Sequence, residues 1–227
     1  MKKKTAAIGL LMSLLPIAQP FVIKSSAALT TSGFIFSISE SSKAESAFSL
    51  YKQGNLKLDY GDINGAISDY TKAIEINPNY SEAYVNRGVA KGNSDDNAGA
   101  ISDYSKAIKI DQSNTLAYFN RGVVKSNLKD YLGAISDYSK AIEIDPNYAI
   151  AYNNRGSIKD EQLRDPYGAI SDYNKAININ PKYTYAYYNR GIAKKNIGDH
   201  SGAISDYSKA IKIDQNYTSA YINRGNI

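Results

Sequence analysis

The hexapeptide Gly65-Ala66-Ile67-Ser68-Asp69-Tyr70 is the unit on which the chain is built, because the same six residues return four more times along the chain. The later copies begin at Gly99, Gly133, Gly168 and Gly202, so that successive copies stand 34, 34, 35 and 34 residues apart. A fixed period of this size is the signature of a repeat array. The tripeptide Asn-Arg-Gly keeps the same period and alternates with the hexapeptide, which gives each repeat two halves.

Both halves follow helical spacing. In the first copy, Ala66, Ile67, Tyr70, Ala73 and Ile74 recur at intervals of three and four residues, which predicts one apolar stripe on a helix. Pro78 follows and stops that helix. The Asn-Arg-Gly half has the same spacing and ends in a short polar turn. Each repeat is therefore predicted to be an antiparallel pair, an A helix with Asn-Arg-Gly and a B helix with the hexapeptide.

Composition excludes several classes of site. The chain of 227 residues has no cysteine and no tryptophan, and His200 is the only histidine. A disulfide framework, a thiolate metal site and a cysteine nucleophile are therefore excluded. The net charge of +5 falls to +1 without Lys2, Lys3, Lys4 and Lys24, which lie in the N-terminal segment. A nearly neutral body with interleaved charges does not favour nucleic acid as a partner.

The first 28 residues have the order of a secretory signal peptide. Three lysines precede the apolar stretch from Thr5 to Leu15, and small residues follow at 25–28, which predicts cleavage after Ala27 or Ala28. The alternative is an uncleaved membrane anchor from Thr5 to Ile23. Residues 29–44 are rich in Ser and Thr and are expected to be a disordered leader. A cleaved signal predicts a periplasmic or secreted location for the repeats. An uncleaved anchor predicts a membrane-anchored protein with the repeats outside the cytoplasm, and membrane contact is expected only in that case.

The pattern resembles the tetratricopeptide repeat family over residues 45–227. The third repeat carries the family's large, small, alanine, aromatic, alanine and proline positions at Tyr118, Gly122, Ala134, Tyr138, Ala141 and Pro146. The resemblance implies an all-α, right-handed superhelical solenoid of antiparallel helix pairs, with five repeats and a final helix. It also implies that the A helices line a concave groove. The fourth repeat has one extra residue near Asp165, which should only lengthen a loop.

Two departures from the family pattern recur in register. Arginine replaces the family's leucine before the glycine, and lysine replaces its tyrosine three residues after the glycine, as at Arg121 and Lys125. Because the B-helix aspartates, such as Asp137, repeat with the arginines, we expect an internal Arg–Asp ladder. The alternative is an arginine patch for anionic ligands. The mid-helix glycines, such as Gly122, are expected to let the B helix approach at its alanines.

The candidate binding residues lie on the A helices. One asparagine per repeat is expected in the groove, where its amide can pair with both polar groups of a peptide backbone. An asparagine ladder of this kind is used in the superhelix of O-GlcNAc transferase, whereas a solvated polar face is the alternative. Phe119 and Tyr188 are expected to add apolar contacts. The five asparagines are Asn86, Asn120, Asn154, Asn189 and Asn223.

The sequence favours a non-catalytic protein. His200 lies in a turn-like stretch, and the carboxylate pairs lie at loops and helix ends, so no cofactor, metal or catalytic residue is predicted. We expect an extracytoplasmic interaction scaffold or assembly factor that holds a peptide segment or partner helix in its groove. The alternative is a structural spacer or subunit of a larger envelope complex. End-to-end self-association remains open as a second kind of contact.

Overall fold

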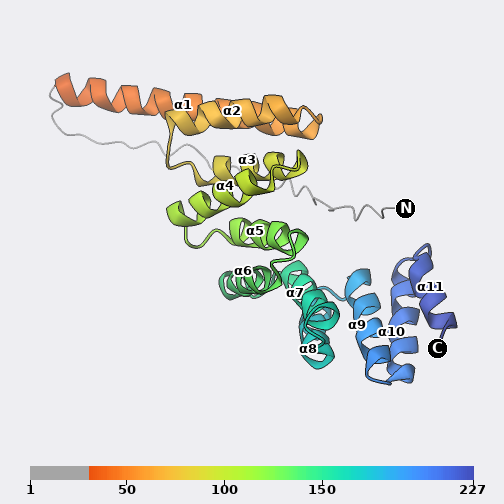
Figure 1. Ribbon diagram of the computed structural model, residues 1–227. Helices are drawn as coiled ribbons and strands as arrows, with labels where there is room; N and C mark the ends of the chain where they lie inside the picture. The colour runs from red at the N-terminus through yellow and green to blue at the C-terminus, as the bar shows by residue number, and fades with distance from the viewer. Residues whose placement is uncertain (1–30) are drawn as a thin grey trace. The chain divides into compact units, whose positions relative to one another are not determined.

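The computed structural model describes residues 31–227, and side chains from Glu40 onward. The chain divides into two units, Met1–Ile38 and Ser39–Ile227, and the repeats lie in the second unit. Eleven helices and no strand lie within the described residues (Figure 1). The A helices are α1 (Thr31–Asp59), α3 (Ser81–Asn93), α5 (Thr115–Asn127), α7 (Ala149–Glu161), α9 (Thr184–Asn196) and α11 (Thr218–Gly225). The B helices are α2 (Ile63–Ile76), α4 (Asn97–Ile110), α6 (Tyr131–Ile144), α8 (Pro166–Ile179) and α10 (His200–Ile213).

The helices pack in chain order, which confirms the predicted solenoid of five helix pairs and a final helix. From α2 to α11, each helix packs against the next helix along the chain. Successive A helices also touch, as α3 does with α5 and α7 with α9. In a stack of this kind each repeat is stabilised mainly by its nearest neighbours.

Each B helix begins at an aspartate that caps it. In α6 the side chain of Asp130 accepts a hydrogen bond at 3.0 Å from the backbone N–H of Gly133, the glycine with which the hexapeptide begins. A Cβ added at Gly133 would lie 2.2 Å from an Asp130 carboxylate oxygen. The glycine therefore leaves room for the cap. The other caps are Asp62, Asp96, Asp165 and Asp199.

The turn from each B helix to the next A helix is closed by a side chain. Asn77 accepts a hydrogen bond from the backbone N–H of Asn79 through Oδ1, at 3.1 Å. Asp111 makes the same contact with Ser113 at 2.9 Å. This local turn needs an Asn or Asp but no proline between the two residues. It explains why Gln112 can stand where the first repeat has Pro78.

Small alanines and large tyrosines make the core. Ala134 and Tyr138 of α6 are almost completely buried, as are their equivalents in the other B helices. The ring of Tyr138 lies against Gly122 of α5, where an added Cβ would be 2.9 Å from the ring and 3.3 Å from the carbonyl oxygen of Ala134. The glycine was expected to let the B helix approach at its alanines, and at Gly122 the backbone of Ala134 is among the nearest contacts. The closer contact was not predicted: at Gly88, Gly122, Gly156 and Gly191 it is a tyrosine ring.

The N-terminal part of α1 differs from the sequence expectation. Residues 29–44 were predicted to be a disordered leader, whereas the structure has residues 31–44 in helix α1. From Glu40 to Glu45 the side chains are exposed, and no proline interrupts the chain there. These residues therefore continue the helix without a buried face of their own. The predicted signal peptide at 1–28 lies outside the described residues, and no helix within 31–227 is long and apolar enough to cross a membrane.

The extra residue of the fourth repeat lies in the turn between α7 and α8, as predicted. Both helices keep the lengths of their equivalents, 13 residues for α7 and 14 for α8. The turn contains Leu163, whose backbone N–H donates to the carbonyl of Ile158 at 3.2 Å. Arg164 has a φ of 54° just before the capping aspartate, where the other turns also have a positive φ. The insertion is absorbed without shifting either helix.

Candidate functional site

Four positions form one stripe on each A helix from α1 to α9, and α11 holds the first two of them. In α5 they are Leu116, Asn120, Val123 and Asn127, which are spaced by four, three and four residues and so share one face of the helix. In α7 the equivalent residues are Ile150, Asn154, Ser157 and Glu161. We call these four positions the A-helix stripe. The five asparagines predicted to bind a peptide all lie at its second position, and all five are partly buried.

Three of these asparagines bind side chains of the preceding A helix. Asn86 donates to Tyr51 Oη at 3.0 Å and to Asn55 Oδ1 at 2.8 Å. In the same way Asn189 donates to Asn153 Oδ1 at 3.1 Å, and Asn223 donates to Tyr188 Oη at 2.9 Å. Their amide donors therefore already hold neighbouring repeats together.

Asn120 and Asn154 differ because the equivalent upstream residue cannot accept a hydrogen bond. That residue is Val85 for Asn120 and Phe119 for Asn154. Asn154 Oδ1 instead accepts a hydrogen bond from Asn153 Nδ2 at 3.4 Å. Burial raises the pKa of Tyr138, and a hydrogen bond between its hydroxyl and Asn154 opposes this effect. For Asn120 no side-chain hydrogen bond is found within the described part of the chain. Its amide is thus open to an external group.

The two aromatic residues predicted to contact a peptide pack mainly against the protein itself. Phe119 lies 5.7 Å from the ring of Tyr138 and 4.9 Å from that of Tyr148, measured between ring centroids. The ring centroid of Tyr188 lies 5.8 Å from that of Tyr207. Both are half-buried, so only part of each ring is available to a ligand.

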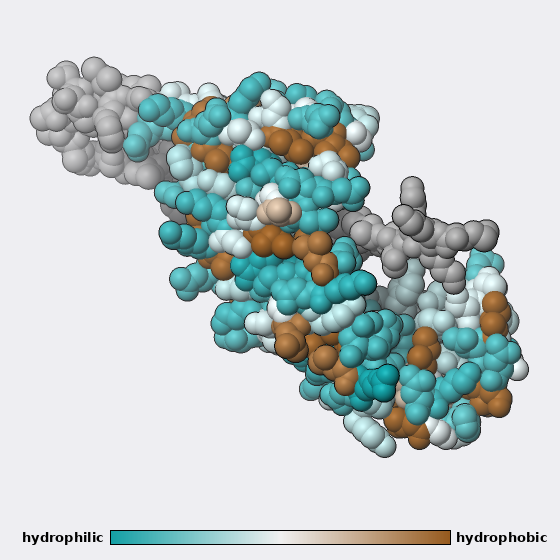
Figure 2. All heavy atoms as spheres, in the orientation of Figure 1, coloured by the Kyte–Doolittle hydropathy of each residue, from teal (hydrophilic) through white to brown (hydrophobic). Residues whose placement is uncertain are grey.

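The first position of the A-helix stripe carries exposed apolar side chains in alternate repeats, a row that sequence reasoning missed and that is interrupted by Glu82 in the second repeat. Phe48, Leu116 and Tyr185 hold this position in the first, third and fifth repeats, and their exposed fractions are 49%, 54% and 44%. Figure 2 shows a largely hydrophilic surface on which hydrophobic patches recur along the stack. The signal was present in the sequence, since the three residues are 68 and 69 residues apart.

A hollow of about 220 Å³ lies on the stripe between α5 and α7. Val123 and Asn127 line it from α5, and Asn154, Ser157 and Glu161 line it from α7. The rings of Tyr131 and Tyr138 add to its wall from α6. Ser157 Oγ donates to Glu161 Oε1 at 3.0 Å, which orients the carboxylate. Among the five predicted asparagines, only Asn154 lines this hollow.

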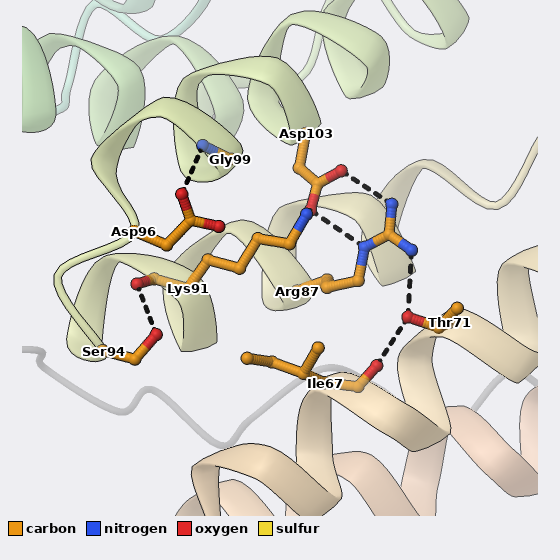
Figure 3. A network of polar contacts seen from close by, with 8 residues as sticks. All are labelled: Ile67, Thr71, Arg87, Lys91, Ser94, Asp96, Gly99 and Asp103. Carbon is orange, nitrogen blue, oxygen red and sulfur yellow. Dashed lines mark hydrogen bonds and ion pairs between the residues drawn. The ribbon is translucent and has the colours of Figure 1, made fainter.

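The recurring arginines form the predicted ladder of ion pairs. Arg87 Nε and Nη2 donate to the two carboxylate oxygens of Asp103, at 2.9 and 2.7 Å (Figure 3). Lys91 Nζ lies 2.8 Å from Asp103 Oδ2, so both departures from the family pattern meet on one buried aspartate. The same arrangement recurs at Arg121, Arg155 and Arg190. Because these guanidinium groups are paired, the arginines do not form a free patch for anions.

The ladder also links neighbouring repeats. Arg87 Nη1 donates to Thr71 Oγ1 at 3.1 Å, and Thr71 belongs to the preceding B helix (Figure 3). Arg121 reaches Ser105 in the same way at 3.0 Å. This link was not predicted, although the residues contacted repeat at the period of the arginines, as a hydroxyl residue or, at Asn174, an amide. Each of the four arginines paired with an aspartate thus joins the B helices of two repeats.

The structure brings no catalytic constellation together in its described part. His200 is exposed at the start of α10. Burial raises the pKa of the Asp160 carboxyl, and a hydrogen bond from Asn196 opposes this effect. Within residues 31–227, no group of three or more His, Asp or Glu is placed to hold a metal ion.

Comparison with protein families finds one repeat type along the chain. A family model described as Tetratricopeptide repeat matches residues 115–148 and 184–217, and another with that description matches 81–114. A third, described as TPR repeat, matches 54–95 and 168–198. A search of curated proteins found no match to this chain.

Several solved structures have the same fold. A crystal structure of MamA is 27% identical, with a TM-score of 0.67 over 73% of this chain and 96% of that one. A crystal structure of YrrB, described as a TPR protein with an unusual peptide-binding site, is 21% identical, with a TM-score of 0.66 over 85% and 97%. Pseudomonas aeruginosa pilF is 19% identical, with a TM-score of 0.71 over 79% and 81%. The last two show similarity of fold alone.

Proposed function

Because the chain belongs to the tetratricopeptide repeat family, we propose that its A-helix stripes bind a peptide segment or a helix of a partner protein. The fold is that of a protein-interaction scaffold, and family and fold are typically non-catalytic. In an array of this kind the repeated side chains of successive A helices present a row of equivalent contacts to a partner. The partner would therefore contact several repeats at once.

The observation that carries this proposal is the exposed apolar row of Phe48, Leu116 and Tyr185. Exposed apolar groups with nearby polar groups are typical of interaction sites. On α5 the open amide of Asn120 lies one turn from Leu116, on the same stripe. A bound segment could bury apolar side chains against the row and pair its backbone with that amide. YrrB offers a precedent in the same fold for a peptide-binding site.

We also propose an extracytoplasmic location for this activity. It is supported by the three lysines, the apolar stretch and the small residues of the first 28 positions. A mature N-terminus near Leu29, found by mass spectrometry of the protein from its native cell, would support the proposal. An intact Met1 in a cytoplasmic fraction would contradict it.

A second candidate function is a structural spacer that contacts a larger complex through another surface. It is favoured by Tyr60, Leu132 and Tyr167, whose side chains are strongly exposed in or beside the turns between A and B helices. Such a spacer would leave the A-helix stripe unused. The two candidates therefore differ in which surface a partner touches.

Photocrosslinking can separate these candidates. The photoreactive residue p-benzoylphenylalanine would be placed at Leu116 on the stripe and, in a second chain, at the exposed Leu132 of the other surface. We expect a partner to crosslink from position 116 and not from 132. The purified partner should then bind Leu116→Ser with Asn120→Ala at least tenfold more weakly. Crosslinks from 132 alone, or unchanged affinity of the double variant, would favour the spacer.

A further inference from the structure

We propose that the hollow between α5 and α7 binds one basic side chain, lysine or arginine, of the partner segment. This inference rests on the proposed function and adds the chemistry of one contact to it. The hollow lies on the A-helix stripe, where the segment would run. Its volume of about 220 Å³ is below the ~300–1,000 Å³ of pockets that enclose whole small-molecule ligands, so it suits a single side chain.

The fourth repeat departs from the other repeats where the hollow forms. At the third stripe position Ser157 stands where the second, third and fifth repeats have a branched aliphatic residue, Val89, Val123 or Ile192, and the first repeat has Asn55. The smaller side chain leaves space between α7 and α5. At the fourth position Glu161 stands where those three repeats have an asparagine, at Asn93, Asn127 and Asn196, and the first repeat has Asp59. In an array whose repeats are nearly identical, two changes that open a space and place a charge in it are a local specialisation.

The charge of the hollow is not neutralised by the protein. Glu161 has no ion pair within the described residues, whereas Asp172 of the next helix has both Arg155 and Lys159. The neighbouring Asp160 also lacks an ion pair in this part of the chain. No lysine or arginine lines the hollow. A partner's ammonium or guanidinium group would supply the missing positive charge, and its contact with Glu161 would be charge-assisted.

The remaining wall fits the rest of such a side chain. Tyr131 and Val123 offer apolar surface to an aliphatic stem, and Asn127, Asn154 and Gln162 offer carbonyl oxygens to N–H donors. An anionic group would be repelled by Glu161. A metal ion would need more oxygen ligands with charge than the single carboxylate of the lining supplies. A basic side chain is therefore the ligand that uses all of these groups.

The test starts from a random library of 12-residue peptides displayed on phage. Selection would be run on the full chain and on two variants that restore the residue of the other repeats, Glu161→Asn and Ser157→Val. We expect peptides selected on the natural chain to share a lysine or arginine at one fixed position, and peptides selected on either variant to lack it. Glu75→Asn is the matched control, because it also removes an exposed carboxylate but lies on α2, away from the A-helix stripe, and it should select the same peptides as the natural chain.

The best arginine peptide would then be compared with its citrulline version, which has the same shape without the charge. We expect citrulline to weaken binding to the natural chain about tenfold and to change binding to Glu161→Asn little. Thermal melts of both variants, followed by circular dichroism, would show that they are folded. Enriched peptides without a fixed basic position, or equal affinity for both versions, would overturn this inference and leave the proposed function standing. If no peptide is enriched, the proposed function fails as well.

Discussion

Arg121 binds Asp137 through two parallel hydrogen bonds, Nε to Oδ2 at 2.9 Å and Nη2 to Oδ1 at 2.7 Å. The aspartate side chain is only 4% exposed, and Lys125 Nζ lies 2.8 Å from its second oxygen. The third arginine nitrogen reaches Ser105 in the preceding repeat. One buried carboxylate is thus held by two cations, and one of these cations spans two repeats.

Replacement of Arg121 by alanine should therefore destabilise the array. It removes the bidentate partner of a buried carboxylate and the link to Ser105, which would cost about 2–4 kcal/mol, near the lower end for a broken buried pair because Lys125 remains. Urea unfolding followed by circular dichroism would measure the loss. Lys140→Ala is the control, since its partner Glu143 is 69% exposed, and it should be neutral. A melting temperature of Arg121→Ala within about a degree of the parent would contradict a stabilising ladder.

Gly122→Ala should lower stability although alanine is the better helix former. The added Cβ would lie 2.9 Å from the ring of Tyr138 and 3.3 Å from a backbone oxygen, and that oxygen cannot move without shifting α6. We expect a loss of about 1–3 kcal/mol from this overpacking. Gly92→Ala in α3 is the matched control, because its Cβ would meet only Ala100 at 3.9 Å. It should be neutral or add up to about 1 kcal/mol. Equal effects of the two substitutions would refute the packing argument.

Asn86→Ala and Asn120→Ala should differ in stability. The first removes hydrogen bonds to Tyr51 and Asn55 and should cost about 1–2 kcal/mol. The second removes no hydrogen bond within the described residues and should change the free energy of unfolding by less than about 0.5 kcal/mol. Thermal and urea melts of both variants would decide this. A large loss at Asn120 would show that this asparagine is structural, which would also weaken its assignment to binding.

Stability should fall at alkaline pH because buried tyrosines resist ionisation. Burial, with a smaller contribution from Asp145, raises the pKa of Tyr148 to about 12, and burial raises the pKa of Tyr183 to about 12. In the unfolded chain the pKa of a tyrosine is ~10, so between about pH 10 and 12 the unfolded state has lost protons that the native state keeps. The contribution of these tyrosines to the free energy of unfolding is therefore complete below about pH 10 and is lost as the pH rises through this range.

Urea midpoints at pH 8 and pH 11 would measure this decrease. Tyr148→Phe removes one of the titrating groups, so its midpoint should fall less between the two pH values than that of the natural chain. An equal fall for both chains would show that Tyr148 does not contribute.

The repeat period was enough to predict the helix pairs, their order and the pairing of Arg121 with Asp137. Each of these depends on residues that recur in register, and a shared period places them at equivalent points of every repeat. The second cation on the aspartate was missed, although Lys125 recurs at the same period. The sequence shows that a lysine is present but does not show how far its side chain reaches.

Whether the amide of each asparagine forms hydrogen bonds within the protein could not be predicted from its own position in the repeat. Asn86 is engaged and Asn120 is open because the upstream residues are Tyr51 and Val85, on another helix. The role of the asparagines in binding a peptide stays a prediction. The hollow was also missed, although Ser157 and Glu161 stand out when the repeats are aligned with one another. A change within one repeat can be recognised only when that repeat is aligned with the others.

The ladder gives the interior of the array a polar seam in place of the leucine and tyrosine that the family pattern has at these two positions. The hydration free energy of charged groups becomes less favourable as temperature rises, so the penalty for dehydrating Arg121, Lys125 and Asp137 decreases on heating. Apolar burial gains no comparable advantage per unit area over the same range. The polar seam therefore contributes a larger share of the free energy of unfolding in warm solution than in cold. In a chain with leucine and tyrosine restored at these positions, apolar burial would supply that share instead.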